Sequence, residues 1–138
     1  MEAWEPGARE AIRELVARYT HLGDGGRIKE MTELFEPDAV VEAIGTGTFA
    51  GHEAMAGFFG GLADRTVTDP DVTYVRHHVA NLTISFDSPT EATGAAYWLV
   101  MNDHGPVRWG RYRDAYRQGP DGEWRFARRQ IRADRQAS

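Results

Sequence analysis

Residues 73–103 read TYVRHHVANLTISFDSPTEATGAAYWLVMND, and this stretch decides the fold class of the chain. Two runs within it, 73–87 and 91–103, are rich in β-branched and aromatic residues, which are typical of strands. The turn-forming residues Asp87-Ser88-Pro89-Thr90 lie between them. Two strand-like runs that flank such a turn predict a β-hairpin.

The same pattern continues downstream of this hairpin. Two more strand-like runs occupy residues 107–118 and 123–133. The loop-forming segments Asp103-His104-Gly105-Pro106 and Gly119-Pro120-Asp121-Gly122 separate them from their neighbours. The second half of the chain therefore predicts a four-stranded antiparallel meander.

The residues before this meander predict helices. Pro6 suits a first helical turn, and apolar residues then recur at the spacing of one buried helical face. The members of this face are Ala8, Ile12, Leu15, Val16, Tyr19 and Leu22. The glycine-rich segment Gly23–Gly26 ends the helix because glycine readily leaves helical geometry. A second, short helix is predicted at Ile28–Phe35, stopped by Glu36-Pro37-Asp38, and a third at about 52–62.

A small β insertion is predicted between the second and third helices. Residues 39–44 read as a strand, and 45–48 as a turn into a short partner strand around Phe49. The element order predicts an α+β domain, with three N-terminal helices packed on a strongly curved, mainly antiparallel sheet. Such a sheet tends to enclose a pocket between itself and its helices. The length of 138 residues suits a single domain, 1–138.

The composition excludes several kinds of chemistry. The chain has no cysteine, so it has no disulfides, thiolate nucleophiles or cysteine-ligated metals. Its five histidines lack the i, i+4 helical spacing of zinc hydrolases, and no glycine-rich phosphate loop joins a strand to a helix. We therefore expect no metal and no cofactor, which leaves acid–base chemistry or ligand binding alone.

The charge distribution argues against nucleic acid as a partner. The formal net charge is −5, and the nine arginines within residues 108–138 are spread along strand-like runs. No apolar run reaches the ~20 residues that a membrane span needs. Residues 1–14 also lack the apolar stretch of a secretory signal. We expect a cytoplasmic protein with no membrane contact.

A few polar side chains are candidates for chemistry. Asp24 follows the helix that carries Tyr19, so both can point toward one end of the domain; a plain helix-end aspartate is the alternative. His77 and His78 are adjacent on one strand, so one of them must face inward. Apolar alternation favours His78 toward the better-packed face, although a β-bulge would exchange the faces. Tyr112 lies on a later strand, where core packing is the alternative.

Six segments in order along the chain resemble SnoaL-like members of the nuclear transport factor 2-like superfamily. They cover nearly the whole chain, and each is weak on its own. The segments are Tyr19-Thr20-His21-Leu22-Gly23-Asp24, residues 34–41 (LFEPDAVV), Gly51-His52-Glu53-Ala54-Met55, Arg76-His77-His78-Val79-Ala80-Asn81, Gly110-Arg111-Tyr112-Arg113-Asp114 and Asp121-Gly122-Glu123-Trp124-Arg125-Phe126.

The resemblance implies a cone-shaped fold in which a bent sheet wraps around the first helix and encloses a pocket. Members include dehydratases, isomerases, polyketide cyclases and non-catalytic binding proteins, so the fold does not fix the reaction. Asp24 and His77 match the catalytic aspartate and histidine of the dehydratases, which favours His77 over His78 as the pocket residue. Tyr19 is similar to a third catalytic residue of bile acid dehydratases.

The resemblance also implies substrate-binding positions. Tyr112 and Trp98 lie at the strand positions that family members turn inward, and His78 is the further candidate. The chain departs from scytalone dehydratase near Ala96, where that enzyme has a second histidine. It departs from ketosteroid isomerase at Ala43, where that enzyme has its base.

These features together predict a cofactor-independent acid–base enzyme acting on a small hydrophobic hydroxylated or carbonyl compound. A lyase of the dehydratase type that uses an Asp24–His77 dyad is the leading interpretation. The alternatives are a polyketide-type cyclase or isomerase in the same pocket, or a non-catalytic ligand-binding protein. The tryptophan, tyrosine and arginine residues of the last strands suit an interface, so we expect a homodimer.

Overall fold

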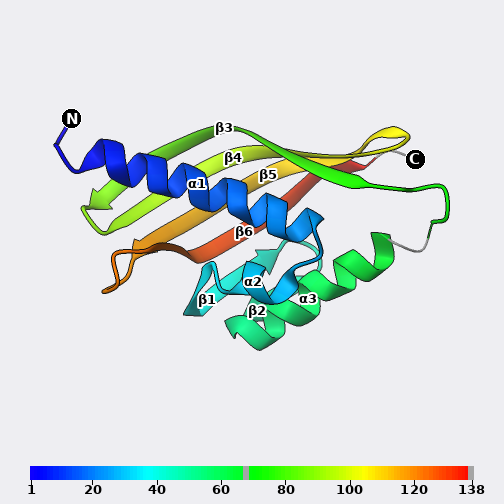
Figure 1. The fold of residues 1–138 in the computed structure, drawn as a ribbon, viewed down its shortest axis with the longest axis horizontal. Coiled ribbons are helices and arrows are strands. Elements are labelled where there is room, and N and C mark those ends of the chain that lie inside the picture. Colours follow the sequence, from blue (N-terminus) through cyan, green and yellow to red (C-terminus); the bar gives the residue numbers. More distant parts are fainter. Residues whose placement is uncertain (67–68, 137–138) are drawn as a thin grey trace.

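The computed structural model describes residues 1–66 and 69–136, which form three helices followed by most of a six-stranded sheet (Figure 1). The elements are α1 (Glu5–Asp24), α2 (Ile28–Thr32), β1 (Phe35–Ala43), β2 (Gly47–Ala50), α3 (Gly51–Thr66), β3 (Val75–Ser88), β4 (Glu91–Asn102), β5 (Gly105–Gln118) and β6 (Trp124–Gln136). This arrangement confirms the predicted α+β class. Residues 67–68 and 137–138 of the expected 1–138 domain lie outside the described residues.

The sheet has the strand order β2-β1-β6-β5-β4-β3 and is not closed. Strands β3 to β6 form the predicted antiparallel meander, and β2 pairs antiparallel with β1. The pair β1–β6 is parallel, with Val41 opposite Arg129. Because this pair joins the small N-terminal insertion to the last strand, the first and last parts of the chain share one sheet.

The helices cover the inner face of the sheet. Figure 1 shows α1 lying across the long strands, and α3 lying beside β1 and β2. An aromatic cluster fills the space below α1, where the ring of Tyr19 contacts those of Phe35, Phe59, Tyr112 and Phe126. All five side chains are buried. Burial of these rings against α1 is the main source of packing energy at this position.

The second helix is shorter than the sequence predicts. It ends at Thr32, and Phe35 begins β1 instead of completing the helix. Phe35 pairs with Phe126 of β6 and is fully buried, so tertiary packing overrides the local helical pattern. Pro37 does not end this helix but lies inside β1. The register of the β1–β6 pair shifts at this point, so the N–H group that proline lacks breaks no regular hydrogen bond of the ladder.

The first helix also protects the free edge of β3. Nη1 of Arg9 donates a hydrogen bond to the carbonyl oxygen of Ile84 at 3.2 Å. At the other end of α1, the backbone N–H of His77 donates to Oδ2 of Asp24 at 2.8 Å. An uncovered edge strand would leave such groups open to pairing with another chain. Asp24 therefore has a structural role in addition to any chemical one.

Within residues 1–66 and 69–136, no helix combines the length and the apolar character that crossing a membrane requires.

Candidate active site

The end of α1 meets the beginning of β3 at a carboxylate–imidazole pair. Nδ1 of His77 lies 2.6 Å from Oδ1 of Asp24, the last residue of α1. The second oxygen of Asp24 accepts the backbone N–H of the same histidine. The two bonds fix both the position of the strand and the orientation of the imidazole ring. Residues separated by 53 positions in sequence are thus held in direct contact.

A β-bulge in β3 determines which histidine faces α1. The pairing of β3 with β4 shifts register between Ala80 and Thr83, and Asn81 within this interval has a φ of 59°. Before the bulge, His77 and Val79 face inward, whereas after it Ile84 does. Asparagine tolerates this left-handed conformation better than most residues, which suits it to the bulge.

The expectation from simple alternation that His78 faces the better-packed side is wrong. His78 is exposed and lies on the opposite face of β3 from His77. The apolar alternation was read from residues beyond Asn81, where the bulge has already exchanged the two faces. His78 therefore lies on the wrong face of β3 to bind a substrate beside His77.

The pair leaves one imidazole nitrogen available. The side chain of His77 is 32% exposed, whereas that of Asp24 is 10% exposed. Among the described residues, Nε2 of His77 has no hydrogen-bond partner. A carboxylate that holds Nδ1–H keeps the other nitrogen free to accept a proton and stabilises the imidazolium that results. This arrangement can act as a general base.

The other candidate residues on the inner face of the sheet, Tyr19, Tyr112 and Trp98, pack against one another. The ring of Tyr112 lies 6.1 Å from that of Tyr19 and 6.0 Å from that of Trp98. All three residues are buried on the inner side of the sheet, and it stays a prediction that Trp98 and Tyr112 line a substrate cavity. Asp24 is among the charges that raise the pKa of Tyr112, which places this tyrosine within electrostatic reach of the pair.

Burial keeps both tyrosines protonated. Desolvation is the largest cause that raises the pKa of Tyr19, and the positive charge of Arg129 opposes it. Desolvation followed by the charge of Tyr19 raises the pKa of Tyr112 far above its ordinary value. Neutral phenols can donate hydrogen bonds but cannot act as bases at ordinary pH. Their available role is therefore that of donors.

A buried ion pair behind the tyrosines was missed by the sequence analysis. Nε and Nη2 of Arg129 bind the two oxygens of Asp114 at 2.8 and 3.0 Å, and both side chains are fully buried. The hydroxyl of Tyr116 donates to Asp114 at 2.8 Å. The guanidinium carbon lies 3.6 Å from the ring centre of Tyr112 and 4.3 Å from that of Tyr19. The alternation that puts Asp114 on the face of Tyr112 was the available signal.

Two hollows on the surface of the described residues lie away from the Asp24–His77 pair. One of about 530 Å³ lies on the outer face of the sheet, opposite the helices, and is lined by residues of β3, β4, β5 and β6 that include Thr83, Ala95 and Arg113. Another, of about 260 Å³, lies between α1, α2 and the start of β6. Neither contains Asp24 or His77. The aromatic cluster around Tyr19 fills part of the space between α1 and the sheet.

In the described part of the chain, no three histidine, aspartate or glutamate side chains are grouped as a metal site would require.

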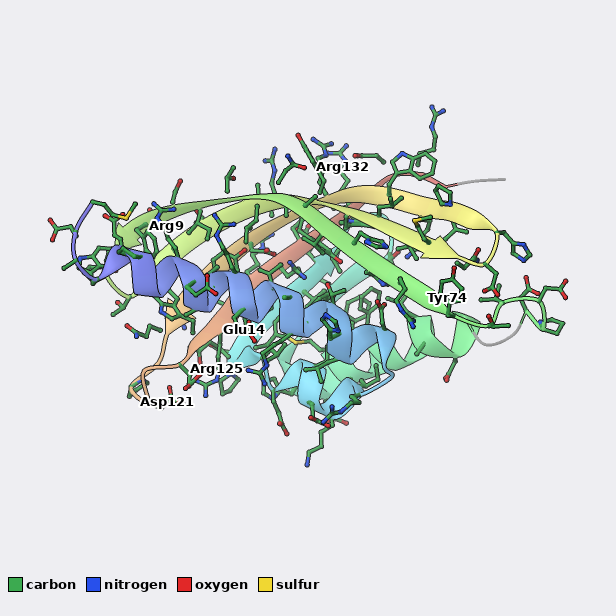
Figure 2. All side chains as sticks on the ribbon, turned by 45° about the horizontal axis from the view of Figure 1, so that its top comes forward. Arg9, Glu14, Tyr74, Asp121, Arg125 and Arg132 are labelled. Atoms are coloured by element: carbon green, nitrogen blue, oxygen red, sulfur yellow. The ribbon has the colours of Figure 1, made fainter. Side chains whose placement is uncertain are left out.

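The segment that leads into β3 is tied to the β4–β5 hairpin. Asp103 accepts hydrogen bonds from the backbone N–H groups of Thr73 and Tyr74, at 2.9 and 3.2 Å, and from the Thr73 hydroxyl. These bonds, led by that of the Thr73 side chain, lower the pKa of Asp103 from 3.8 to about 2. The ring of Tyr74 lies at the same end of the sheet (Figure 2).

We expect this connection to loosen in acid. A carboxyl group whose folded-state pKa is depressed stabilises the fold above its unfolded pKa and loses that effect as the pH falls. Between pH 3.8 and pH 2, the protection of the Thr73 and Tyr74 amides against hydrogen exchange, measured relative to the intrinsic rate at each pH, should therefore fall. In Asp103→Asn the two amides should exchange faster than in the wild type above pH 3.8. The fall in their protection between pH 3.8 and pH 2 should be absent from this variant. Equal protection in both proteins would contradict this.

Comparison with known proteins agrees with this geometry. The sequence pattern of the SnoaL-like domain matches residues 5–130. The chain belongs to the SnoaL-like domain family. Its match extends from the first turn of α1 to the middle of β6 and so includes Asp24, His77 and the buried ion pair. A search of curated proteins gives no match.

Solved structures share the fold of this SnoaL-like domain. A nuclear transport factor 2-like protein with a cystatin-like fold from Novosphingobium aromaticivorans is 27% identical, with a TM-score of 0.80 over 94% of this chain and 84% of that one. A scytalone dehydratase-like protein from the same organism is 23% identical, with a TM-score of 0.83 over 99% and 91%. A Catenulispora acidiphila protein in complex with S-DNPA is 24% identical, with a TM-score of 0.81 over 94% and 96%.

Proposed function

We propose that this SnoaL-like domain is a cofactor-independent acid–base enzyme that dehydrates a small hydrophobic hydroxylated carbonyl compound. One observation carries the proposal: His77 is held by Asp24 through a 2.6 Å contact to Nδ1 while Nε2 remains free. The imidazole is partly exposed and its partner is nearly buried, an arrangement suited to a base that must reach a substrate. The complex of the Catenulispora acidiphila protein with a small molecule supports a small-molecule ligand for this fold.

The reaction would proceed through an enolate. Nε2 of His77 takes the proton from the carbon next to the carbonyl group, and the electron pair of that C–H bond moves to the carbonyl oxygen. As the enolate collapses, a carbon–carbon double bond forms and the C–O bond at the β-carbon breaks. The imidazolium returns its proton to the departing hydroxide, which leaves as water. A cyclase or isomerase would use the same first step and a different fate of the enolate.

The tyrosines would supply the electrophilic side of this reaction. A hydrogen bond to a developing enolate oxygen stabilises the charge that forms in the transition state. Tyr112 is the better placed donor, because it lies within electrostatic reach of Asp24. Tyr19 packs against four aromatic rings and would act mainly by holding Tyr112 in place.

Proton exchange tests the first step without knowledge of the product. We would incubate a panel of small β-hydroxy ketones and esters with the protein in D₂O and follow loss of the α-proton by NMR. Compounds that raise the melting temperature would be tested first, because a ligand that binds only the folded state stabilises it. Exchange or water loss that requires His77 supports the proposal, whereas binding without exchange contradicts it.

A non-catalytic binding protein is the second candidate, and one observation favours it. Asp24 also accepts the backbone N–H of His77 and so closes the free edge of β3. If that were its main role, the side-chain contact would be structural. Asp24→Asn would then leave ligand binding unchanged, since an asparagine oxygen still accepts the backbone N–H of His77. No compound would be turned over by the wild type.

The outer face of the sheet is the proposed surface of the expected homodimer. Tyr97 on this face is 58% exposed, and it lies opposite Arg111 in the β4–β5 ladder. Half-buried Leu99 and Trp109 form the next outward pair. The same face carries the 530 Å³ hollow. A two-fold axis can place the protruding rings of one copy over the hollow of the other, because an isologous interface uses one patch twice.

Light scattering at high protein concentration should give about twice the 15.5 kDa mass of one chain. Tyr97→Glu would place a charge at the centre of the interface and should yield the monomer mass. Tyr74→Glu offers a matched control, since Tyr74 is also exposed but lies outside this face of the sheet. A wild-type mass of one chain would contradict the dimer.

A further inference from the structure

Arg108 is a half-buried cation with no anionic partner. It lies on β5, and in the described part of the chain its guanidinium makes no hydrogen bond or ion pair. It contacts an aromatic ring instead: the guanidinium carbon lies 5.8 Å from the ring centre of Trp98. A guanidinium that is partly removed from water usually binds a carboxylate or another planar anion.

Neighbouring arginines differ from Arg108 in one of two ways. Most are paired with acids: Arg111 with Asp134, Arg117 with Asp38, Arg125 with Asp121, Arg128 with Glu42 and Arg129 with Asp114. Arg113, Arg132 and Arg135 are exposed, so water solvates their charge. Figure 2 shows Arg132 projecting from the outer face, away from α1. Arg108 instead belongs to the inner face.

The strand register places Arg108 in one row with His77. His77 pairs with Val100 of β4, and Val100 pairs with Arg108 of β5. Opposed residues of an antiparallel pair share a face, and Val100 is buried on the inner side. The α-carbons of His77 and Arg108 are therefore about 10 Å apart, two strand spacings. A molecule of the size of one or two rings can contact both side chains.

Trp98, two residues before Val100 on the same face of β4, carries a second unpartnered donor. Trp98 is only 4% exposed, and its buried Nε1 has no hydrogen-bond partner among the described residues. The indole reaches over β5 at Gly110, where an added Cβ would come within 2.7 Å of Cζ2. A buried N–H without an acceptor is rare and costly. Within the described residues, Arg108 and Trp98 thus present donors without an acceptor on the face of the sheet that also carries His77.

We propose that the ligand of this site carries a carboxylate that Arg108 binds, while its apolar body lies against Trp98. The inference rests on the proposed function and narrows its substrate class: the reacting carbonyl compound bears a second, anionic group. The carboxylate would be oriented by the guanidinium, and the carbon to be deprotonated would lie over Nε2 of His77. Arg108 then determines specificity rather than taking part in proton transfer.

Binding of two matched probes tests this. We would measure the dissociation constants of 2-naphthoate and its neutral amide, 2-naphthamide, by calorimetry. The indole N–H signal of Trp98, assigned with Trp98→Phe, would report binding at this position. The wild type should bind the carboxylate about tenfold or more tightly than the amide, which is the usual strength of a charge-assisted hydrogen bond. The carboxylate should also shift the Trp98 signal.

Variants distinguish binding of the carboxylate by Arg108 from a general effect of positive charge on affinity. Arg108→Gln should bind both probes equally, and Arg108→Lys should retain part of the preference, because the charge remains but the planar fork is lost. Arg113→Gln is the matched control: it removes the same charge from the same strand on the outer face, and should keep the full preference. Equal affinity of the wild type for both probes, or no binding of the carboxylate, would overturn the proposal. So would an unmoved Trp98 signal or an equal loss in Arg113→Gln.

The result is distinguishable from failure of the proposed enzyme. His77→Ala should keep the preference for the carboxylate, since His77 does not bind it. If the preference is found but no compound undergoes exchange, the enzymatic proposal fails and the anion site stands. If exchange requires His77 but the carboxylate preference is absent, the anion site fails alone.

Discussion

His77→Ala is expected to lower turnover by about 10²–10⁴-fold, the usual contribution of a general base. The substitution removes the nitrogen that accepts the substrate proton, while the backbone N–H that binds Asp24 remains. The fold should therefore persist, and circular dichroism would verify it. Turnover of a compound found in the exchange screen is the measurement.

Asp24→Asn should cause a similar loss. Its side-chain oxygen can still accept the backbone N–H of His77, so the edge of β3 stays closed. The amide nitrogen cannot accept Nδ1–H or stabilise an imidazolium, which leaves the ring in the wrong tautomer.

His78→Ala is the internal control, since His78 is exposed on the other face of β3. It should cost little activity. Loss of activity in His78→Ala with normal activity in His77→Ala would move the site to the outer face. Normal activity in all three variants would contradict the assignment of Asp24 and His77 as the catalytic pair.

Asp114→Ala is expected to destabilise the fold by about 3–5 kcal/mol, the usual cost of breaking a buried ion pair. Arg129 is fully buried and would lose its partner. It cannot escape by deprotonation: burial favours the neutral form, but the charge of Asp114 more than offsets this, and the pKa of Arg129 lies above its ordinary value. The hydroxyl of Tyr116 would lose its acceptor as well. Urea denaturation would measure the change in the free energy of unfolding.

Two further variants make this prediction specific. Asp114→Leu combined with Arg129→Met removes both charges and should recover much of the lost stability, since the charge left without a partner is the main cost. Asp121→Asn breaks the exposed pair with Arg125, which lies on the β5–β6 hairpin (Figure 2), and should change stability little. A loss in Asp114→Ala no larger than that in Asp121→Asn would contradict the role assigned to the buried pair.

Much of the fold follows from local signals. The apolar spacing from Ala8 to Leu22 predicts α1 because the buried face of a helix repeats with its turn. The two hairpin loops after Asp103 and Gly119 separate the strands of the meander by turn chemistry alone. The end of α2 could not be predicted in this way. Phe35 leaves the helical pattern because it stacks on Phe126, at a ring distance of 4.8 Å, from the far end of the chain.

The candidate site, like the fold, follows partly from local sequence signals and partly from tertiary packing. The sequence by itself placed Asp24 at the end of α1 and two histidines on one strand, and the alternation of side chains along β5 puts Tyr112 and Asp114 on one face. Strand periodicity did not decide between His77 and His78; the tertiary structure decided that His77 meets Asp24, as the resemblance had implied, because the bulge at Asn81 exchanges the faces of β3. It also decided that Arg129 pairs with Asp114 and that Arg108 shares a row with His77. Strand register sets these contacts, and register depends on how whole strands pair rather than on any short stretch of residues.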